Sequence, residues 1–286
     1  MPRGAAPALE RNYNCLTFEG QGQGGVIHEQ KIPFRHDCEK VVTSVVDYAL
    51  TRIALMGISM GRYLAAKAAA FENRIAACIL NDGFFDGYDA LASSFPKSLL
   101  TALDNGDSKS VNMVIDILME FDPNIRFNIK HGMWTAGIST PFDLIQVSKN
   151  YTMKNIAGNI KCPTLVLEAE NGDSFPGQPE KLFDTLTCPK KYILFTTEES
   201  ADEHCQCGAP ALSNQRIFDW SDATFQKAPD QSKSNRNIAI QKNERLKTTA
   251  ASFHLLAICR PEPVITICNI IFNNNDQNGF DQISRE

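Results

Sequence analysis

Residues 53–71 read IALMGISMGRYLAAKAAAF and place a serine between two glycines, where a strand-like segment passes into a helical one. Residues 53–56 are uninterruptedly apolar, as in a buried parallel strand, and apolar side chains after Ser59 recur at helical spacing. In the pattern G-x-S-x-G, a strand turns sharply into a helix and lifts the serine hydroxyl above the sheet. Gly57 and Gly61 suit this turn, because a side chain at either position would collide with neighbouring structure. The stretch therefore predicts a serine nucleophile on a strand–helix elbow.

The composition is that of an acidic enzyme built on one main core. The chain has 286 residues, 43% of them hydrophobic, which suffices for one α/β core plus an insertion. A net charge of -5 gives no basic surface for phosphate backbones, so nucleic acid is not an expected partner. The sequence shows neither a long apolar run nor an apolar leader, so we expect a cytoplasmic protein without membrane contact. Nine cysteines spread singly through apolar segments favour reduced thiols over disulfides.

Strands and helices alternate on both sides of the elbow, which predicts an α/β fold with a mostly parallel sheet and helices on both faces. Expected strands are 13–18, 53–56, 74–82, 162–168 and 191–196, and expected helices outside residues 90–160 are 37–52, 60–71, 179–186 and 209–220. The helix before the elbow runs into the strand without a loop, so either it ends early, near Tyr48, or loop residues are missing there.

Four segments are expected along the chain. Residues 11–89 and 161–222 form the two parts of the core. Residues 90–160 show helical periods and no clear strand, so we expect a helical cap over the carboxyl edge of the sheet. The tail, residues 223–286, is atypical and is expected to be disordered, because much of it is polar and without period.

Two further sequence patterns could indicate a nucleotide site or a metal site, and neither interpretation is favoured. The glycine-rich segment EGQGQGG, residues 19–25, has neither of the spacings that bind nucleotides, so no cofactor is expected. The segment HCQC, residues 204–207, could ligate zinc, but no second cluster of ligands accompanies it. We therefore expect no metal.

A serine hydroxyl needs a base, and the base needs a carboxylate to orient it. Of the five histidines, His204 is favoured because it lies in the loop after the last core strand, where catalytic groups of a parallel sheet collect. His28 and His36 lie in the first loop, His131 in the cap and His254 in the tail.

The predicted acid is Asp173, which follows the strand at 162–168 and gives the chain order Ser, Asp, His of an α/β hydrolase. Glu168, Glu170, Asp82 and Asp86 are competing carboxylates. The turn-forming sequence Asn-Gly-Asp favours Asp173, and the two earlier aspartates are expected to line the pocket or cap a helix.

Several segments together resemble the fungal polyketide-processing α/β hydrolases. They are EGQGQGG, GISMG, AACI, PTLVLEAENGDSFPGQP, EHCQCGA and NQRIFDW, within residues 11–222. That family includes hydrolases that shorten a polyketide pigment precursor and polyketide transferases, and it is related to bacterial 2,6-dihydroxypseudooxynicotine hydrolase. The resemblance implies an α/β-hydrolase fold with Ser59 as nucleophile, Asp173 as acid and His204 as base. The backbone amide of Met60 would lie in the oxyanion hole.

The resemblance also implies the reaction: cleavage of an ester, or of a C–C bond next to a ketone, or acyl transfer, on a small polyketide-like substrate in secondary metabolism. The oligomeric state is left open, with a homodimer among the options.

The chain departs from the family pattern at the abrupt junction of Arg52 and Ile53, in the tail after Asp222, and in two further places. Arg62 stands where a second glycine is usual and is expected to crowd the elbow or the pocket. The chain also begins after the family's N-terminal helical region and after a strand whose loop supplies a second oxyanion amide. Losing one such donor lowers turnover by about 10² to 10³. A catalytically impaired, truncated relative is therefore an alternative to an active hydrolase or transferase.

Overall fold

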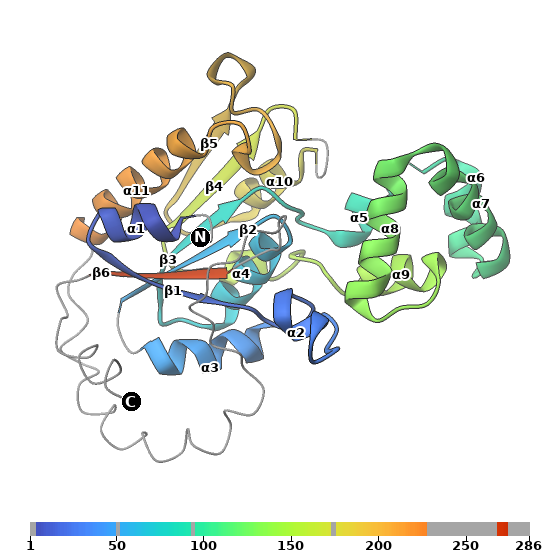
Figure 1. Cartoon of the computed structure of the whole chain (residues 1–286), viewed down its shortest axis with the longest axis horizontal. Coiled ribbons are helices and arrows are strands. Elements are labelled where there is room, and N and C mark those ends of the chain that lie inside the picture. Colours follow the sequence, from blue (N-terminus) through green and yellow to red (C-terminus); the bar gives the residue numbers. More distant parts are fainter. Residues whose placement is uncertain (1–3, 50–51, 93–94, 173–175, 228–267, 274–286) are drawn as a thin grey trace.

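The centre of the protein is a six-stranded sheet with the order β1-β6-β2-β3-β4-β5 (Figure 1). The computed structural model describes residues 4–49, 52–92, 95–172, 176–227 and 268–273. The strands are β1 (Tyr13–Phe18), β2 (Ile53–Ile58), β3 (Ile75–Asn81), β4 (Thr164–Ala169), β5 (Lys190–Phe195) and β6 (Cys268–Asn273). Strands β2 to β5 are parallel, whereas β6 is antiparallel to both of its neighbours. The predicted fold class, a mostly parallel sheet with helices on both faces, is confirmed.

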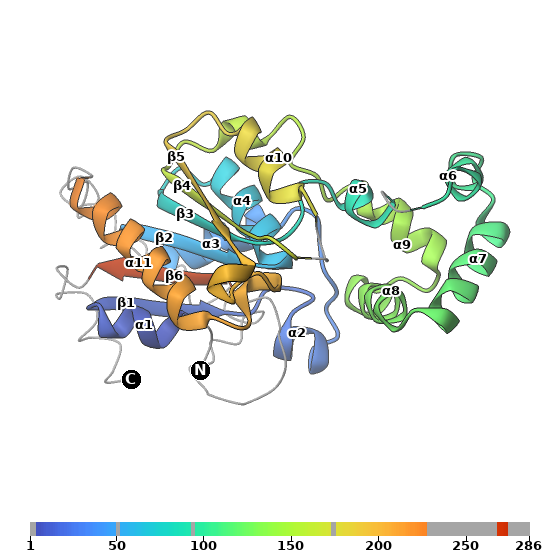
Figure 2. The same cartoon turned by 90° about the horizontal axis from the view of Figure 1, so that it is seen from above.

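Helices cover both faces of this sheet because its central strands are apolar on both sides (Figure 2). One face carries α3 (Glu39–Ala49), α4 (Met60–Phe71) and α10 (Gln178–Thr185), and the other carries α1 (Ala5–Glu10) and α11 (Pro210–Lys227). Successive residues of β2 alternate between the two cores: Leu55 packs with α3 and α4, whereas Met56 packs with α11.

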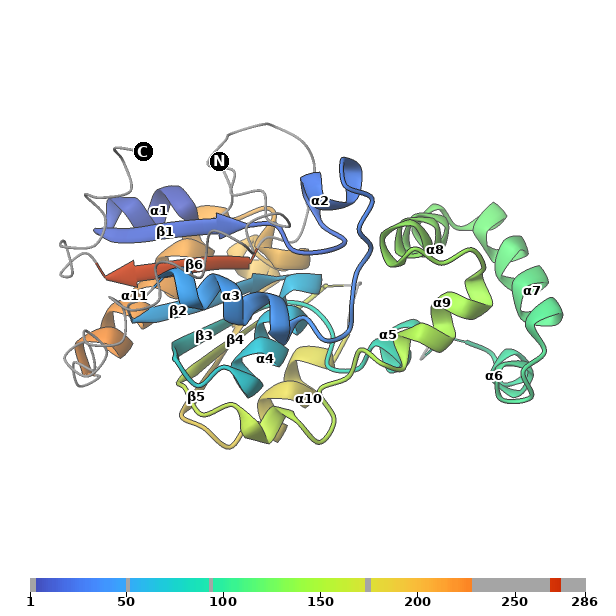
Figure 3. The same ribbon diagram turned by 90° about the horizontal axis from the view of Figure 1, so that it is seen from below.

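The cap is a separate group of helices beyond one end of the sheet (Figure 3). It consists of α5 (Gly87–Ala92), α6 (Lys97–Asp104), α7 (Ser108–Phe121), α8 (Pro123–Ala136) and α9 (Pro141–Ser148). Its own apolar core is centred on residues such as Leu103, Ile115 and Ile145. Two chain segments connect cap and core, and they are joined where Gly87 N–H donates to the Tyr151 carbonyl at 2.7 Å.

A second connection to the cap comes from the segment after β1. Helix α2 (Gly24–His28) follows the glycine-rich loop, and the His28 ring lies 4.8 Å from that of Trp134 in α8. Farther along, Phe34 N–H donates to the Thr135 carbonyl at 2.8 Å. The glycine-rich loop therefore leads into a strap that contacts the cap.

The helix before the elbow ends at Ala49, and β2 begins at Ile53. The sequence suggests either that this helix ends early, near Tyr48, or that loop residues are missing before β2. The observed helix end agrees with the first interpretation.

The tail differs from its expected description in two places. Helix α11 continues to Lys227, past the expected boundary at residue 222. Residues 268–273, expected to lie outside the fold, form β6 and pair with both β1 and β2. The physical reason is that CNIIFN is rich in residues that favour strands, and the space between β1 and β2 offers free ladder groups on both sides. The remainder of the tail, residues 228–267 and 274–286, lies outside the described residues.

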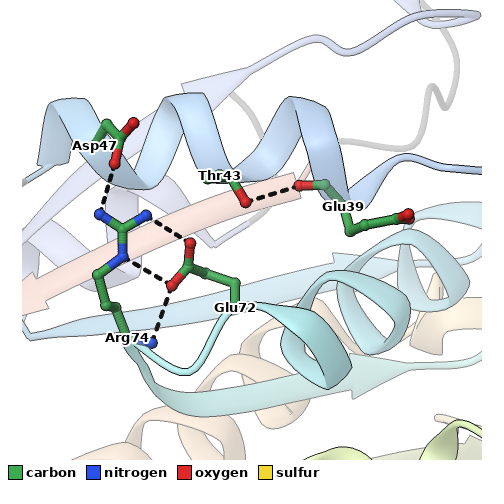
Figure 4. Close-up of polar contacts among 5 residues, drawn as sticks. All are labelled: Glu39, Thr43, Asp47, Glu72 and Arg74. Atoms are coloured by element: carbon green, nitrogen blue, oxygen red, sulfur yellow. Dashed lines mark hydrogen bonds and ion pairs between the residues drawn. The ribbon is translucent and has the colours of Figure 1, made fainter.

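A charged cluster joins the end of α4 to α3 on the surface of the core (Figure 4). The Arg74 guanidinium donates to the Glu72 carboxylate at 2.8 and 2.5 Å and to Asp47 of α3 at 2.6 Å. The Glu72 side chain is 8% exposed, and its hydrogen bonds from Arg74 hold the pKa of this carboxyl below its usual value. On α3, the Thr43 hydroxyl donates to the Glu39 carbonyl at 3.0 Å.

We expect Glu72→Gln to lower the free energy of unfolding by about 1 kcal/mol at pH 7, the usual size of a charge-assisted hydrogen bond near a surface. A carboxyl whose folded pKa is lowered stabilises the fold above its unfolded pKa, and this contribution is lost as the pH falls through the folded pKa. The difference between variant and wild type should therefore shrink below about pH 4. Urea unfolding at pH 7 and pH 3.5 measures it, with the exposed Glu120→Gln as control. Equal stability of Glu72→Gln and wild type at pH 7 would contradict the assignment.

Strand β6 should be required for a stable sheet, because β1 and β2 are joined through it in the described structure. A chain that ends at residue 267 should have a melting temperature lower by at least about 5 °C than a chain that ends at residue 273. Differential scanning calorimetry of the two proteins makes the comparison. Identical melting temperatures would show that β6 contributes nothing to the sheet.

Candidate active site

Ser59 lies on a sharp turn between β2 and α4, as the sequence predicts. Its backbone angles are φ 55° and ψ −123°, a conformation that is strained for a residue with a side chain. Gly57 is required by this turn, since a Cβ atom there would lie 2.0 Å from the Gly61 carbonyl oxygen. The close approach of strand and helix therefore accounts for the first glycine of the G-x-S-x-G pattern.

The end of β3 supports the strained turn from the side. Ser59 N–H donates to the carbonyl oxygen of Asn81 at 2.9 Å, which continues the pairing of β2 with β3 by one residue. Two residues later, Gly83 passes so close that a Cβ atom would lie 2.3 Å from the Ser59 carbonyl oxygen. The neighbouring strand thus fixes both sides of the Ser59 peptide.

His204 reaches the same point from the far end of the chain. Its Nε2 atom lies 3.0 Å from Ser59 Oγ, although 145 residues separate the two. His204 opens a short 3-10 turn in which Cys205 and Gln206 have positive φ angles of 55° and 53°. Both are buried, and Cys205 Sγ lies 3.3 Å from the same Nε2 atom. Of the predicted site residues, the structure therefore brings Ser59 and His204 together.

The carboxylate near this histidine in the described structure is Asp82. Its Oδ2 atom lies 3.4 Å from His204 Nδ1 and accepts the Cys205 N–H at 2.5 Å. Asp82 is buried, directly follows β3 and has a φ of 45°, a conformation that aspartate and asparagine tolerate better than most residues. The sequence offers a signal that could have identified it, because Asp82 and Ser59 end neighbouring parallel strands.

The predicted acid, Asp173, lies outside the described residues, so its role stays a prediction. The other competing carboxylates have partners elsewhere. Asp86 lies 3.2 Å from Lys154 Nζ at the base of the cap. Glu168 accepts the Tyr192 hydroxyl, and Glu170 accepts the Thr197 N–H.

Arg62 lies beneath the elbow with its side chain fully buried, and its guanidinium binds backbone carbonyls. It donates to Gly83 O at 2.6 Å and to Gln178 O at 3.2 Å. Burial lowers the pKa of Arg62 to about 10, and the negative charges of Asp82 and Glu168 oppose this shift. The expectation that Arg62 crowds the elbow is not what the structure shows, because the long side chain extends to the carbonyls of two neighbouring segments.

Gln178 completes this support. Its side-chain oxygen accepts the backbone N–H groups of Phe85 and Asp86 at 2.9 and 3.0 Å. Arg62 and Gln178 therefore hold the loop that begins with Asp82 at several points along its backbone.

The donor atoms of Asp82, His204 and Cys205 lie within 4.8 Å of one another, which is close enough to consider a metal ion. In the described structure, however, each of these side chains already takes part in a polar contact within the site. The exposed Cys207, the other thiol of the HCQC segment, donates to the His204 carbonyl instead. The contacts fit a hydrogen-bonded serine–histidine pair better than a zinc site.

Met60 is the first residue of α4. The first N–H groups of a helix lack acceptors within the helix and favour negative charge. The Met60 amide, immediately after Ser59, therefore has the place in the chain that an oxyanion donor needs, and its role stays a prediction.

Two general properties bear on the sequence-based expectations. No helix in the described ranges is long and apolar enough to cross a membrane. The structure places no disulfide among the cysteines whose side chains it describes, which are Cys15, Cys38, Cys78, Cys162, Cys188, Cys205 and Cys207.

Comparison with known proteins identifies fungal relatives. The chain is 32% identical over 244 residues to 20-hydroxy-prefusarin hydrolase FUS2 of Gibberella moniliformis, covering 78% of this chain and 58% of the relative. It is 31% identical to Hydrolase LUC6 of a Fusarium species, with the same coverage, and 31% identical to Alpha/beta hydrolase psoB of Aspergillus fumigatus, covering 74% and 54%. The chain thus spans little more than half the length of these curated relatives. No protein-family profile matches it.

Among solved structures, the crystal structure of 2,6-dihydroxy-pseudo-oxynicotine hydrolase matches with a TM-score of 0.49 and 20% identity, covering 71% of this chain and 50% of that one. The parallel sheet, the strand–helix elbow with its serine, and the sequence identity to the fungal relatives lead to one assignment. The chain belongs to the α/β hydrolases, in the group of fungal proteins that these relatives represent.

Proposed function

We propose that the protein is a serine hydrolase that cleaves an ester, or a C–C bond next to a ketone, in a small polyketide-like molecule of secondary metabolism. The observation that carries the proposal is the 3.0 Å separation between Ser59 Oγ and His204 Nε2 at the carboxyl end of the sheet. A hydroxyl on a strained elbow, in hydrogen-bond contact with an imidazole, is the arrangement that nucleophilic acyl transfer requires.

In the proposed reaction, His204 Nε2 accepts the Ser59 proton while Oγ forms a bond to the substrate carbonyl carbon. The carbonyl oxygen becomes an oxyanion, for which the Met60 N–H is the proposed donor. When the oxyanion collapses, the bond to the leaving group breaks and the imidazolium supplies its proton. Water then attacks the acyl-enzyme by the same route and releases Ser59. We propose Asp173 as the acid of this triad.

Water is favoured as the acyl acceptor because the similar fungal proteins are named hydrolases. The runner-up is a transferase in which a hydroxyl of a second molecule takes the place of water. The two differ in their product, since transfer to an added alcohol yields a new ester whereas hydrolysis yields a free acid. A cytoplasmic location is part of the proposal, and the single spacing of the nine cysteines through apolar segments favours it, because cytosolic cysteines stay reduced.

A fluorophosphonate probe should label the wild-type protein and should not label Ser59→Ala. Removal of the nucleophile should also lower the hydrolysis of p-nitrophenyl acetate by at least about 10³-fold. Ser221→Ala is the matched control, because this buried serine bonds the Ile217 carbonyl within α11, and it should label like wild type.

The rival from another class is a non-catalytic relative that folds poorly or serves only for binding. A relative that serves only for binding would show a cooperative thermal transition together with no labelling and no ester hydrolysis by the wild-type chain. That result would refute the proposed activity for this chain.

Asp173→Asn should lower kcat for the activated ester by about 10² to 10⁴-fold, because the acid fixes the tautomer of the base. Asp86→Asn should leave kcat near wild type, since the Asp86 carboxylate contacts Lys154 and accepts the Asp89 N–H in the described structure. Steady-state kinetics of the two variants at pH 7.5 decide the matter. A larger loss in Asp86→Asn would remove Asp173 from the triad.

A further inference from the structure

The residues that end β3 contact both members of the serine–histidine pair. The Asn81 carbonyl accepts the Ser59 N–H, and Gly83 lies against the Ser59 carbonyl. Between them, the Asp82 carboxylate reaches the turn that carries His204. Three consecutive residues therefore touch the nucleophile on one side and the base on the other.

From this arrangement we propose that Asp82 is a positioning residue for His204, so that the end of β3 sets the distance between the base and Ser59. The inference rests on the proposed function, in which His204 is the base. It adds a carboxylate to the site and does not require that Asp173 be absent from it.

The first support is the strained turn at Cys205 and Gln206. Positive φ is unfavourable for both of these successive non-glycine residues, so surrounding contacts must hold them in place. The Cys205 N–H, at the start of this strain, donates to Asp82 Oδ2 at 2.5 Å. Because this amide directly follows His204, a shift of the hydrogen bond would move the imidazole relative to Ser59.

The second support is the charge of Asp82. Its Oδ2 atom is 3.4 Å from His204 Nδ1, the nitrogen that faces away from Ser59. A carboxylate there stabilises the positive imidazolium that forms when His204 takes the serine proton. Asp82 is only 3% exposed, so its charge interacts through a poorly screened region.

The third support is the way Asp82 itself is held. Its N–H donates to the Leu167 carbonyl of β4 at 3.1 Å, and Arg62 binds the next carbonyl, that of Gly83, at 2.6 Å. The buried guanidinium also supplies a positive charge close enough to interact with the Asp82 carboxylate. Asp82 is thus anchored to the sheet on one side and to the elbow helix on the other.

Two substitutions separate the hydrogen bond from the charge. Asp82→Asn keeps an oxygen that can accept the Cys205 N–H and suits the positive φ, but it removes the charge. Asp82→Ala removes both. Asp86→Asn is the matched control, because Asp86 is also buried, lies four residues later, caps the start of α5 through the Asp89 N–H and has its ion pair with Lys154.

With p-nitrophenyl acetate as substrate, we expect kcat to fall about 10- to 100-fold in Asp82→Asn and about 10³-fold in Asp82→Ala. KM should change by less than about twofold, because Asp82 touches the base and not the substrate. Asp86→Asn should retain wild-type kcat. Wild-type kcat in both Asp82 variants would overturn the proposal, as would a loss confined to KM.

A spectroscopic measurement tests the inference independently of turnover. In protein labelled with ¹⁵N-histidine, the imidazole signals of His204, assigned with His204→Gln, should change in both Asp82 variants. The signals of His28 and His131 should stay where they are, since the His28 ring packs on Trp134 of α8 and the His131 ring, itself on α8, stacks on Phe127. If Asp82→Ala does not fold, the His204 signals and kcat of Asp82→Asn alone test the role of Asp82.

Unchanged His204 signals in a folded Asp82 variant would refute the inference. Failure of the proposed function has a different signature, namely a wild-type protein that the fluorophosphonate probe does not label. The two failures are therefore distinguishable. If only the role of Asp82 is wrong, the probe still labels the wild-type protein. If only the proposed function is wrong, the His204 signals still change in the Asp82 variants.

Discussion

The hydrogen bond from Ser59 N–H to the Asn81 carbonyl is the contact on which the site depends. It extends the ladder between β2 and β3 one residue past the end of β2, to a residue whose own backbone is strained. A strained residue persists only where its surroundings determine its conformation. The neighbouring strand supplies that constraint, and Gly83 completes it by allowing the backbone to pass close to Ser59.

Charge burial beneath the elbow is the second constraint. Arg62 is fully buried, and in the described structure two of its guanidinium nitrogens donate to the backbone carbonyls of Gly83 and Gln178. A buried charge is tolerated when such acceptors and opposite charges lie nearby, and the carboxylates of Asp82 and Glu168 supply the opposite charge. The long side chain at this position therefore ties the elbow helix to the loop after β3 and to α10.

Strand β6 shows that a local sequence pattern does not reveal which strands a segment will pair with. The segment CNIIFN is visibly apolar, yet it does not belong to the alternation of strands and helices that precedes it. It pairs antiparallel between β1 and β2, more than two hundred residues from either. Periodicity describes which residues can form a strand, whereas the choice of neighbours depends on which ladder edges the rest of the sheet leaves unpaired.

The elbow, the alternation of parallel strands and helices, the helical cap and the loop that carries His204 can all be predicted from the amino-acid sequence. These features follow from local periodicity and from backbone conformations that only certain residues adopt. The tertiary structure decided which groups meet: Ser59 with His204, Asp82 with the turn after His204, and Arg62 with the loop after β3. The residues of the first two contacts are more than one hundred positions apart, and their distances are set by strand order and register, which no local pattern encodes.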